Sequence, residues 1–291
     1  MFAKLLKYDM RSLKKQAVPI LIALIALTVL ASISGFFSVR YLVSTDNSAE
    51  INEFKSIIAF FVTMMLSLGS MFVMILFGAA ATIMLVLVCV RFYKNTVSDE
   101  GYLTFTLPVK SNEIIFSKLV SGLIWTAVIT IASVLGILVV LFSAVLGIEA
   151  LTLSDLSEIF KGLWEIIMGV FEGLEFGIVL IVIQAIISVI TSLAFELLLF
   201  YTAIFFASTI TQKNKGLAAV GCVIGANTVM SIFSSIFSMV LMPLMITVDS
   251  ASDAIASYNI TLLVTILFYG GAAVGCYFLL KNMMDKRLNL S

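Results

Sequence analysis

The chain has no histidine among its 291 residues and only three cysteines. Without histidine it lacks the commonest general base, and zinc sites such as H-E-x-x-H are excluded. Cys89, Cys222 and Cys276 lie in separate apolar runs, far apart in the sequence. They form neither a C-x-x-C site nor a disulfide framework, so we expect them to act as small apolar residues.

Charge is also scarce, since 12% of the residues are charged and 62% are hydrophobic. Soluble domains carry about 25% charged residues. The mean hydropathy is +1.18, and a soluble fold of this length could not bury so much apolar surface. The composition therefore indicates lipid as the solvent. The net charge is zero and no basic patch suits nucleic acid, so we expect no nucleic-acid partner.

Several catalytic motifs are missing. The sequence has no G-x-x-x-x-G-K-[ST] P-loop and no G-x-S-x-G nucleophile elbow. No aspartate lies inside an apolar run, which excludes the paired acids of an intramembrane aspartyl protease. We therefore expect no enzyme activity, and no catalytic, cofactor-binding or metal-binding residues on this chain.

What the sequence does have is six long apolar runs, at 17–39, 57–90, 119–147, 177–210, 217–247 and 259–280. Each exceeds the roughly 20 residues that a helix needs to cross a bilayer. We predict an all-α membrane protein with six transmembrane helices in a single domain, 1–291. The second run would be about 51 Å long as one straight helix, with Gly69 and Gly78 as candidate bends. One long helix is favoured over two short spans, because a joining loop there would have no polar residues.

The basic residues predict the orientation. With the N-terminus in the cytoplasm, all but three of the 17 Lys and Arg residues fall on the inside, and only Arg40, Lys55 and Lys161 fall outside. Every loop then satisfies the positive-inside rule. We expect a multi-pass membrane protein with both termini cytoplasmic. The inside residues are Lys4, Lys7, Arg11, Lys14, Lys15, Arg91, Lys94, Lys110, Lys118, Lys213, Lys215, Lys281, Lys286 and Arg287.

Two further segments have amphipathic patterns. In residues 1–15, apolar side chains such as Phe2 and Leu13 alternate with five basic residues. This suits a helix on the cytoplasmic interface, or a solvated basic flank that only sets topology. In residues 154–175, charged residues recur every three or four positions, which predicts an extracytoplasmic amphipathic helix. That helix either caps a pathway or packs on the bilayer surface.

Glu196 is the one acid near the middle of an apolar run. A carboxylate at that depth costs a few kcal/mol, so it must face the bundle, a watery cavity or a partner. Gln184 falls on roughly the same side of the helix, and Asn227 in the fifth run is a candidate hydrogen-bond donor. These residues form either a polar patch in a transport path or subunit interface, or a protonated acid satisfied by a neighbouring helix.

A polar loop of about 28 residues, 91–118, separates the second and third spans. Ser98 can cap a helix that begins with acids, and Pro108 stops it. The short helix 98–107 would present aromatic and leucine side chains on the cytoplasmic face. It is either a docking surface for another protein or an interfacial helix with its aromatics among lipid headgroups. The residues concerned are Asp99, Glu100, Gly101, Tyr102, Leu103, Phe105 and Pro108.

This loop resembles the cytoplasmic segment of ABC-2 type transporter permeases. The resemblance lies in the acid-Glu-Gly run at 99–101, the Leu107-Pro108 pair and the lysine before the third span, Lys118. The six spans and the N-terminal segment also fit the layout of that family. The sequence departs at Lys110-Ser111, where the family pattern has a Ser-Arg-like pair.

The resemblance implies a permease subunit of an ATP-driven exporter in a bacterial cell membrane. Two such subunits, identical or different, would pair with two separate ABC ATPase subunits, and ATP and magnesium would bind only on those partners. The helix at 98–107 would dock in the ATPase and transmit its closure. Two alternatives stay open: a stand-alone secondary transporter or channel, and a membrane anchor or assembly protein without a transport role.

Overall fold

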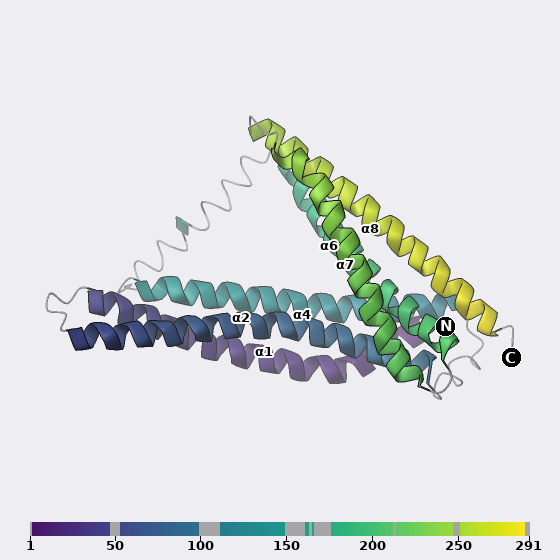
Figure 1. The fold of residues 1–291 in the computed structure, drawn as a ribbon, viewed down its shortest axis with the longest axis horizontal. Helices are drawn as coiled ribbons and strands as arrows, with labels where there is room; N and C mark the ends of the chain where they lie inside the picture. The colour runs from purple at the N-terminus through teal and green to yellow at the C-terminus, as the bar shows by residue number, and fades with distance from the viewer. Residues whose placement is uncertain are drawn as a thin grey trace. The chain divides into compact units, whose positions relative to one another are not determined.

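The computed structural model describes residues 2–46, 53–98, 111–148, 161–162, 165, 176–211, 214–246 and 251–288 (Figure 1). Over these ranges the chain is helical, with no strand. The long helices are α1 (Phe2–Asp46), α2 (Glu53–Thr96), α4 (Ser111–Ile148), α6 (Phe176–Ile210), α7 (Lys215–Ile246) and α8 (Ala251–Leu288).

Each predicted apolar run lies in one of these helices, apart from residue 247, which is outside the described residues. Six helices of the described chain are long and apolar enough to cross a membrane. This confirms the all-helical fold class. α2 continues through Gly69 and Gly78 without a break, as the single-helix reading predicted. A helix satisfies its own backbone hydrogen bonds, which is the condition for crossing a lipid phase.

The amphipathic segments are described only in part. Residues 2–15 continue directly into the rest of α1, so a separate interfacial helix is not confirmed. Their two-sided pattern is real, because the five basic side chains are exposed while Leu13 is buried. The predicted helix 154–175 lies outside the described residues, except that Lys161, Gly162 and Glu165 are helical.

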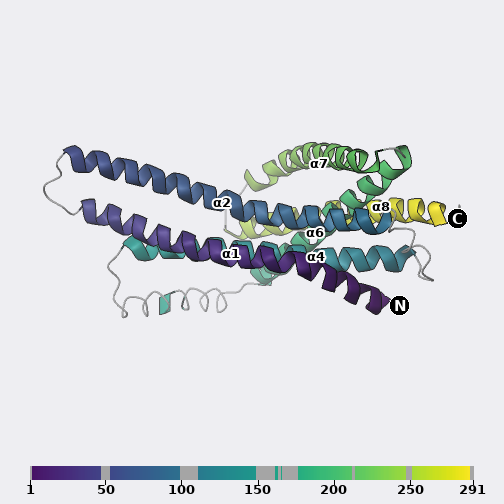
Figure 2. The same ribbon diagram turned by 90° about the horizontal axis from the view of Figure 1, so that it is seen from below.

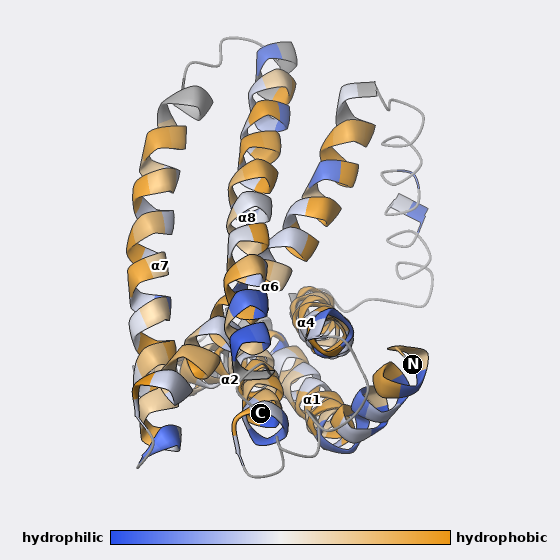
Figure 3. Cartoon of the chain, turned by 90° about the vertical axis from the view of Figure 1, so that its right-hand side faces the viewer, coloured by the Kyte–Doolittle hydropathy of each residue, from blue (hydrophilic) through white to orange (hydrophobic). Residues whose placement is uncertain are grey.

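The surface of the helices is largely apolar. Large hydrophobic side chains are exposed on all six, for example Ile25, Met71 and Val240, at 64%, 67% and 68%. Figure 3 shows hydrophobic residues along most of α7 and hydrophilic ones near the end of α8 that carries the C-terminus. Exposed apolar surface on this scale needs a lipid environment, so the chain is a multi-pass membrane protein in contact with the bilayer.

The chain divides into two compact units. Unit 1 comprises Met1–Arg11, Val86–Leu123 and Phe171–Ser291, and unit 2 comprises Ser12–Leu85 and Ile124–Val170. The single transmembrane domain predicted for residues 1–291 stays a prediction.

In unit 1, α6 packs chiefly against α8, with α7 on a second side of α6. At the start of α6, the Asn259 side chain donates a hydrogen bond of 3.3 Å to the Gly177 carbonyl. Phe195 and Tyr269 meet farther along the same pair of helices, with ring centroids 5.7 Å apart. A side-chain amide and a pair of aromatic rings thus join these helices. The rest of their surfaces is aliphatic and does not favour one packing partner over another.

In unit 2, α1, α2 and α4 run side by side (Figures 1 and 2). α1 and α4 are parallel, because Gly136 faces Thr28 while Gly147 faces the backbone of Phe36. Small residues let the two backbones approach closely, as is common for helices in lipid.

Gly136 is the tightest point of this packing. A Cβ atom there would lie 2.5 Å from Phe77 Cε1 and 2.9 Å from Thr28 Oγ1. Phe77 is fully buried, so its ring has nowhere to move. The close packing of α1, α2 and α4 therefore depends on the absence of a side chain at Gly136.

We expect Gly136→Ala to destabilise the protein by about 1–3 kcal/mol, the usual effect of overpacking a filled core. Gly78→Ala in α2 is the matched control, because its Cβ would meet nothing within 4 Å. The measurement is thermal unfolding in detergent. Phe77→Leu should partly rescue Gly136→Ala. Equal melting temperatures for the two alanine variants would contradict the packing described here.

Candidate functional site

A buried polar cluster joins α1 to α4 in unit 1. Lys118 Nζ lies 3.4 Å from Asp9 Oδ1, and Ser117 donates a hydrogen bond of 2.8 Å to Asp9 Oδ2. All three residues are buried, and Ser117 has no exposed surface at all. We call Asp9, Ser117 and Lys118 the Asp9 cluster. It places a paired charge where water is excluded, so each member depends on the others.

The sequence analysis does not predict that Asp9 is buried and paired, although the sequence contains a signal for it. Asp9 is the only acid among residues 1–15 and comes four residues before Leu13, on the apolar side of that segment. A lone acid on an apolar stripe needs a partner. From the sequence, Lys118 is noted only as a basic residue on the inside and as the lysine before the third span in the family resemblance. The structure adds that the two residues form an ion pair.

Aromatic residues extend the Asp9 cluster to α2 and α6. The Tyr201 hydroxyl donates a hydrogen bond of 3.2 Å to the Lys118 carbonyl oxygen. The Phe92 ring stacks on Tyr201, with centroids 4.0 Å apart and planes 11° apart. Gly122 makes room for this arrangement, because a Cβ there would lie 3.0 Å from the Tyr201 hydroxyl. Four helices thus meet around Lys118.

Both ends of the loop between α2 and α4 are held by this part of unit 1. At the first end, Thr96 and Val97 are buried, and the Val97 amide donates to the Tyr93 carbonyl at 2.9 Å. At the second end, Ser111 begins α4, and its hydroxyl donates to Asp285 Oδ1 of α8 at 2.6 Å. The residues on either side of the loop are therefore buried in unit 1, and the second end is bonded to α8.

The residues predicted to form the docking helix lie outside the described residues. They are Asp99, Glu100, Gly101, Tyr102, Leu103, Phe105 and Pro108. Beside the described loop ends, Arg91 Nε and Asn112 Oδ1 are buried and have no hydrogen-bond partner among the described residues. These two atoms flank the segment that carries Asp99 and Glu100.

The predicted intramembrane polar residues are not brought together. Glu196 is half-buried on α6, within electrostatic range of Cys89, and makes no hydrogen bond with the described residues. Gln184 has a buried side-chain oxygen without a partner in the described chain. Asn227 is exposed on α7. A spacing of about 18 Å along the helix axis separates Gln184 from Glu196, so they cannot share one patch.

Over the ranges that the structure describes, no three His, Cys, Asp or Glu residues lie together as metal ligands. Comparison with family models, with curated proteins and with solved structures finds no match to this chain.

Breaking the ion pair should cost more than removing it. Asp9→Asn leaves Lys118 charged and unpaired, and Lys118→Met leaves Asp9 with Ser117 alone. Each single variant should lose about 3–5 kcal/mol, while the double variant should recover most of that loss. Unfolding in detergent measures it, with Lys94→Met as the exposed-lysine control. Additive losses in the double variant would show that the two side chains do not interact.

Proposed function

We propose that the chain is the permease subunit of an ATP-driven ABC-2 type exporter, coupled through the loop at 98–107 to a separate ATPase subunit. One observation supports the proposal beside the resemblance: the residues that flank the loop, Thr96, Val97 and Ser111, are buried next to the helix junction around Lys118.

These contacts could transmit a displacement of the loop to the membrane helices. Ser111 connects the second end of the loop to α8 through Asp285. Two turns farther along α4, Lys118 connects to α1 through Asp9 and to α6 through Tyr201. A buried ion pair is costly to break and has two discrete states, made or broken, so it suits a switch rather than a gradual deformation. ATP binding on the partner would bias that switch.

The proposal includes the orientation and the partners. The 14 basic residues assigned to the inside support an orientation in which both termini, the Asp9 cluster and the loop face the cytoplasm of a bacterial cell, where an ATPase could reach them. The segment 154–175 then lies outside. A second permease subunit completes the transporter, and ATP and magnesium bind to the ATPase alone.

The coupling role predicts the effect of removing the loop aromatics. Tyr102→Ala with Phe105→Ala should release the ATPase or uncouple its hydrolysis from transport. Buried interface aromatics often contribute about 2 kcal/mol or more, roughly a 30-fold change in affinity. The measurements are ATPase co-purification and ATP-dependent transport, normalised to the amount of inserted permease.

The matched control is Phe37→Ala with Phe72→Ala, two lipid-exposed aromatics at 64% and 60%. It should leave both measurements unchanged. Full ATPase co-purification and transport in the loop variant would contradict the coupling role and favour a stand-alone transporter or channel. Loss of activity in both variants would mean a general defect instead of a coupling defect.

Topology is tested separately by cysteine accessibility. In a background with Cys89, Cys222 and Cys276 replaced, cysteines introduced at residues 46 and 165 should react with an impermeant thiol reagent on intact cells. Cysteines at 99 and 213 should react only after the membrane is opened, because the basic residues hold those loops inside. Labelling of residue 99 from outside would reverse the orientation and remove the basis for ATPase docking.

A further inference from the structure

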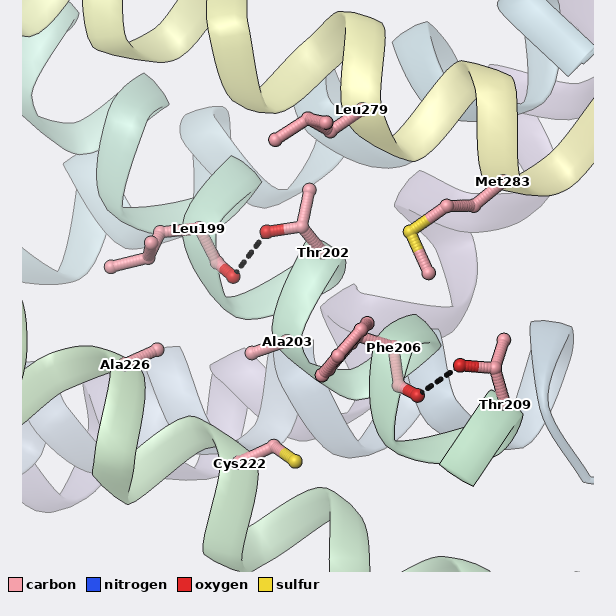
Figure 4. A pocket seen from close by; sticks show the side chains of 9 residues that line it. All are labelled: Leu199, Thr202, Ala203, Phe206, Thr209, Cys222, Ala226, Leu279 and Met283. Atoms are coloured by element: carbon pink, nitrogen blue, oxygen red, sulfur yellow. Dashed lines mark hydrogen bonds between the residues drawn. The ribbon is translucent and has the colours of Figure 1, made fainter. Parts of the chain in front are cut away.

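An apolar cavity lies in unit 1 between α6, α7 and α8, with a volume of about 570 Å³ (Figure 4). Its walls include Leu199, Ala203 and Phe206 of α6, Ala226 of α7, and Leu279 and Met283 of α8. This volume is within the range of small-molecule sites, about 300–1,000 Å³.

The two hydroxyl groups of the cavity wall already donate hydrogen bonds within α6. The Thr202 hydroxyl donates to the Leu199 carbonyl at 2.7 Å, and the Thr209 hydroxyl donates to the Phe206 carbonyl at 2.7 Å, as the dashed lines in Figure 4 show. No lining residue carries a charge. The Cys222 thiol, which also lines the cavity, is only a weak hydrogen-bonding group. A ligand there gains mainly by burying hydrocarbon, so the cavity suits an acyl chain.

Two lysines mark one end of this cavity. Lys215 comes seven residues before the lining residue Cys222, and Lys286 comes seven residues after Leu279. Seven residues make about two helical turns, so each lysine lies on the cavity side of its helix, about 10 Å toward the helix end. α7 begins at Lys215 and α8 ends at Leu288, so both lysines lie at membrane-surface ends of their helices. Cationic groups there fit an anionic headgroup.

We propose that this cavity binds an anionic phospholipid, with one acyl chain between α6, α7 and α8 and the headgroup at Lys215 and Lys286. The assignment is independent of the proposed exporter function, because it rests on the walls of the cavity and on the placement of the two lysines.

The test is tryptophan quenching by lipids with brominated acyl chains. Trp125 and Trp164 are replaced by Phe, and a single Trp is placed in the cavity by Phe206→Trp. Its control is Phe278→Trp, a similarly exposed aromatic, at 60% against 51%, on another side of α8 from Leu279 and Met283. The full chain is reconstituted in phosphatidylcholine with increasing fractions of brominated phosphatidylglycerol or brominated phosphatidylcholine.

Phosphatidylglycerol should reach half-maximal quenching of the cavity Trp at a mole fraction at least five-fold lower than phosphatidylcholine. The control Trp should show no preference. Lys215→Gln with Lys286→Gln should abolish the preference, whereas Lys281→Gln, on the opposite side of α8, should keep it. Filling the cavity with Ala226→Phe should lower quenching at position 206 in variants that melt normally.

Equal quenching curves at positions 206 and 278 would overturn the site, since they describe ordinary annular lipid. A preference that survives the double lysine variant would overturn the headgroup contact. A brominated free fatty acid that quenches with the same selectivity as phosphatidylglycerol would overturn the assignment to a phospholipid.

Discussion

The ion pair between Asp9 and Lys118 is the interaction on which the organisation of unit 1 depends. In lipid, aliphatic side chains gain little by choosing one helix over another, so apolar packing alone does not fix register. A buried charge has only one satisfactory partner position. Asp9 and Ser117 differ by 108 positions, and in unit 2 Thr28 faces Gly136 with the same offset. One polar pair and a set of small residues thus specify the same parallel register for α1 and α4.

The same ion pair links the start of α4, where the loop between α2 and α4 ends, to α1. Lys118 lies two turns into α4, close to where the chain emerges from the loop, and its carbonyl accepts the Tyr201 hydroxyl while its ammonium meets Asp9. A displacement of the start of α4 must therefore either carry α1 and α6 with it or break a buried ion pair. That choice between two states is what a transporter driven by a distant hydrolysis site requires. The acyl-chain cavity lies on a different face, formed by α6, α7 and α8.

Apolar run length alone was enough to predict the helices. Some features could not be predicted, for physical reasons. The charges near the N-terminus predict topology but do not show which of them is buried, although Asp9 is the single acid there. Helical phase puts Gln184 and Glu196 on roughly the same side of α6, but phase fixes a side and not a distance. Asn227 is exposed on α7, whereas its neighbour Ala226 lines the cavity. The role proposed for the loop aromatics depends on a partner protein, which the sequence of this chain does not describe.

The central claim is that the loop at 98–107 touches an ATPase, and contact is most directly measured by site-specific cross-linking in the native membrane. A photoreactive amino acid replaces Phe105, and a second strain carries it at Phe37 as a lipid-facing control. The account predicts that position 105 captures a P-loop ATPase, that the yield changes when ATP hydrolysis is trapped, and that position 37 captures none. Capture of no ATPase from position 105, with the protein present in normal amount, would contradict it.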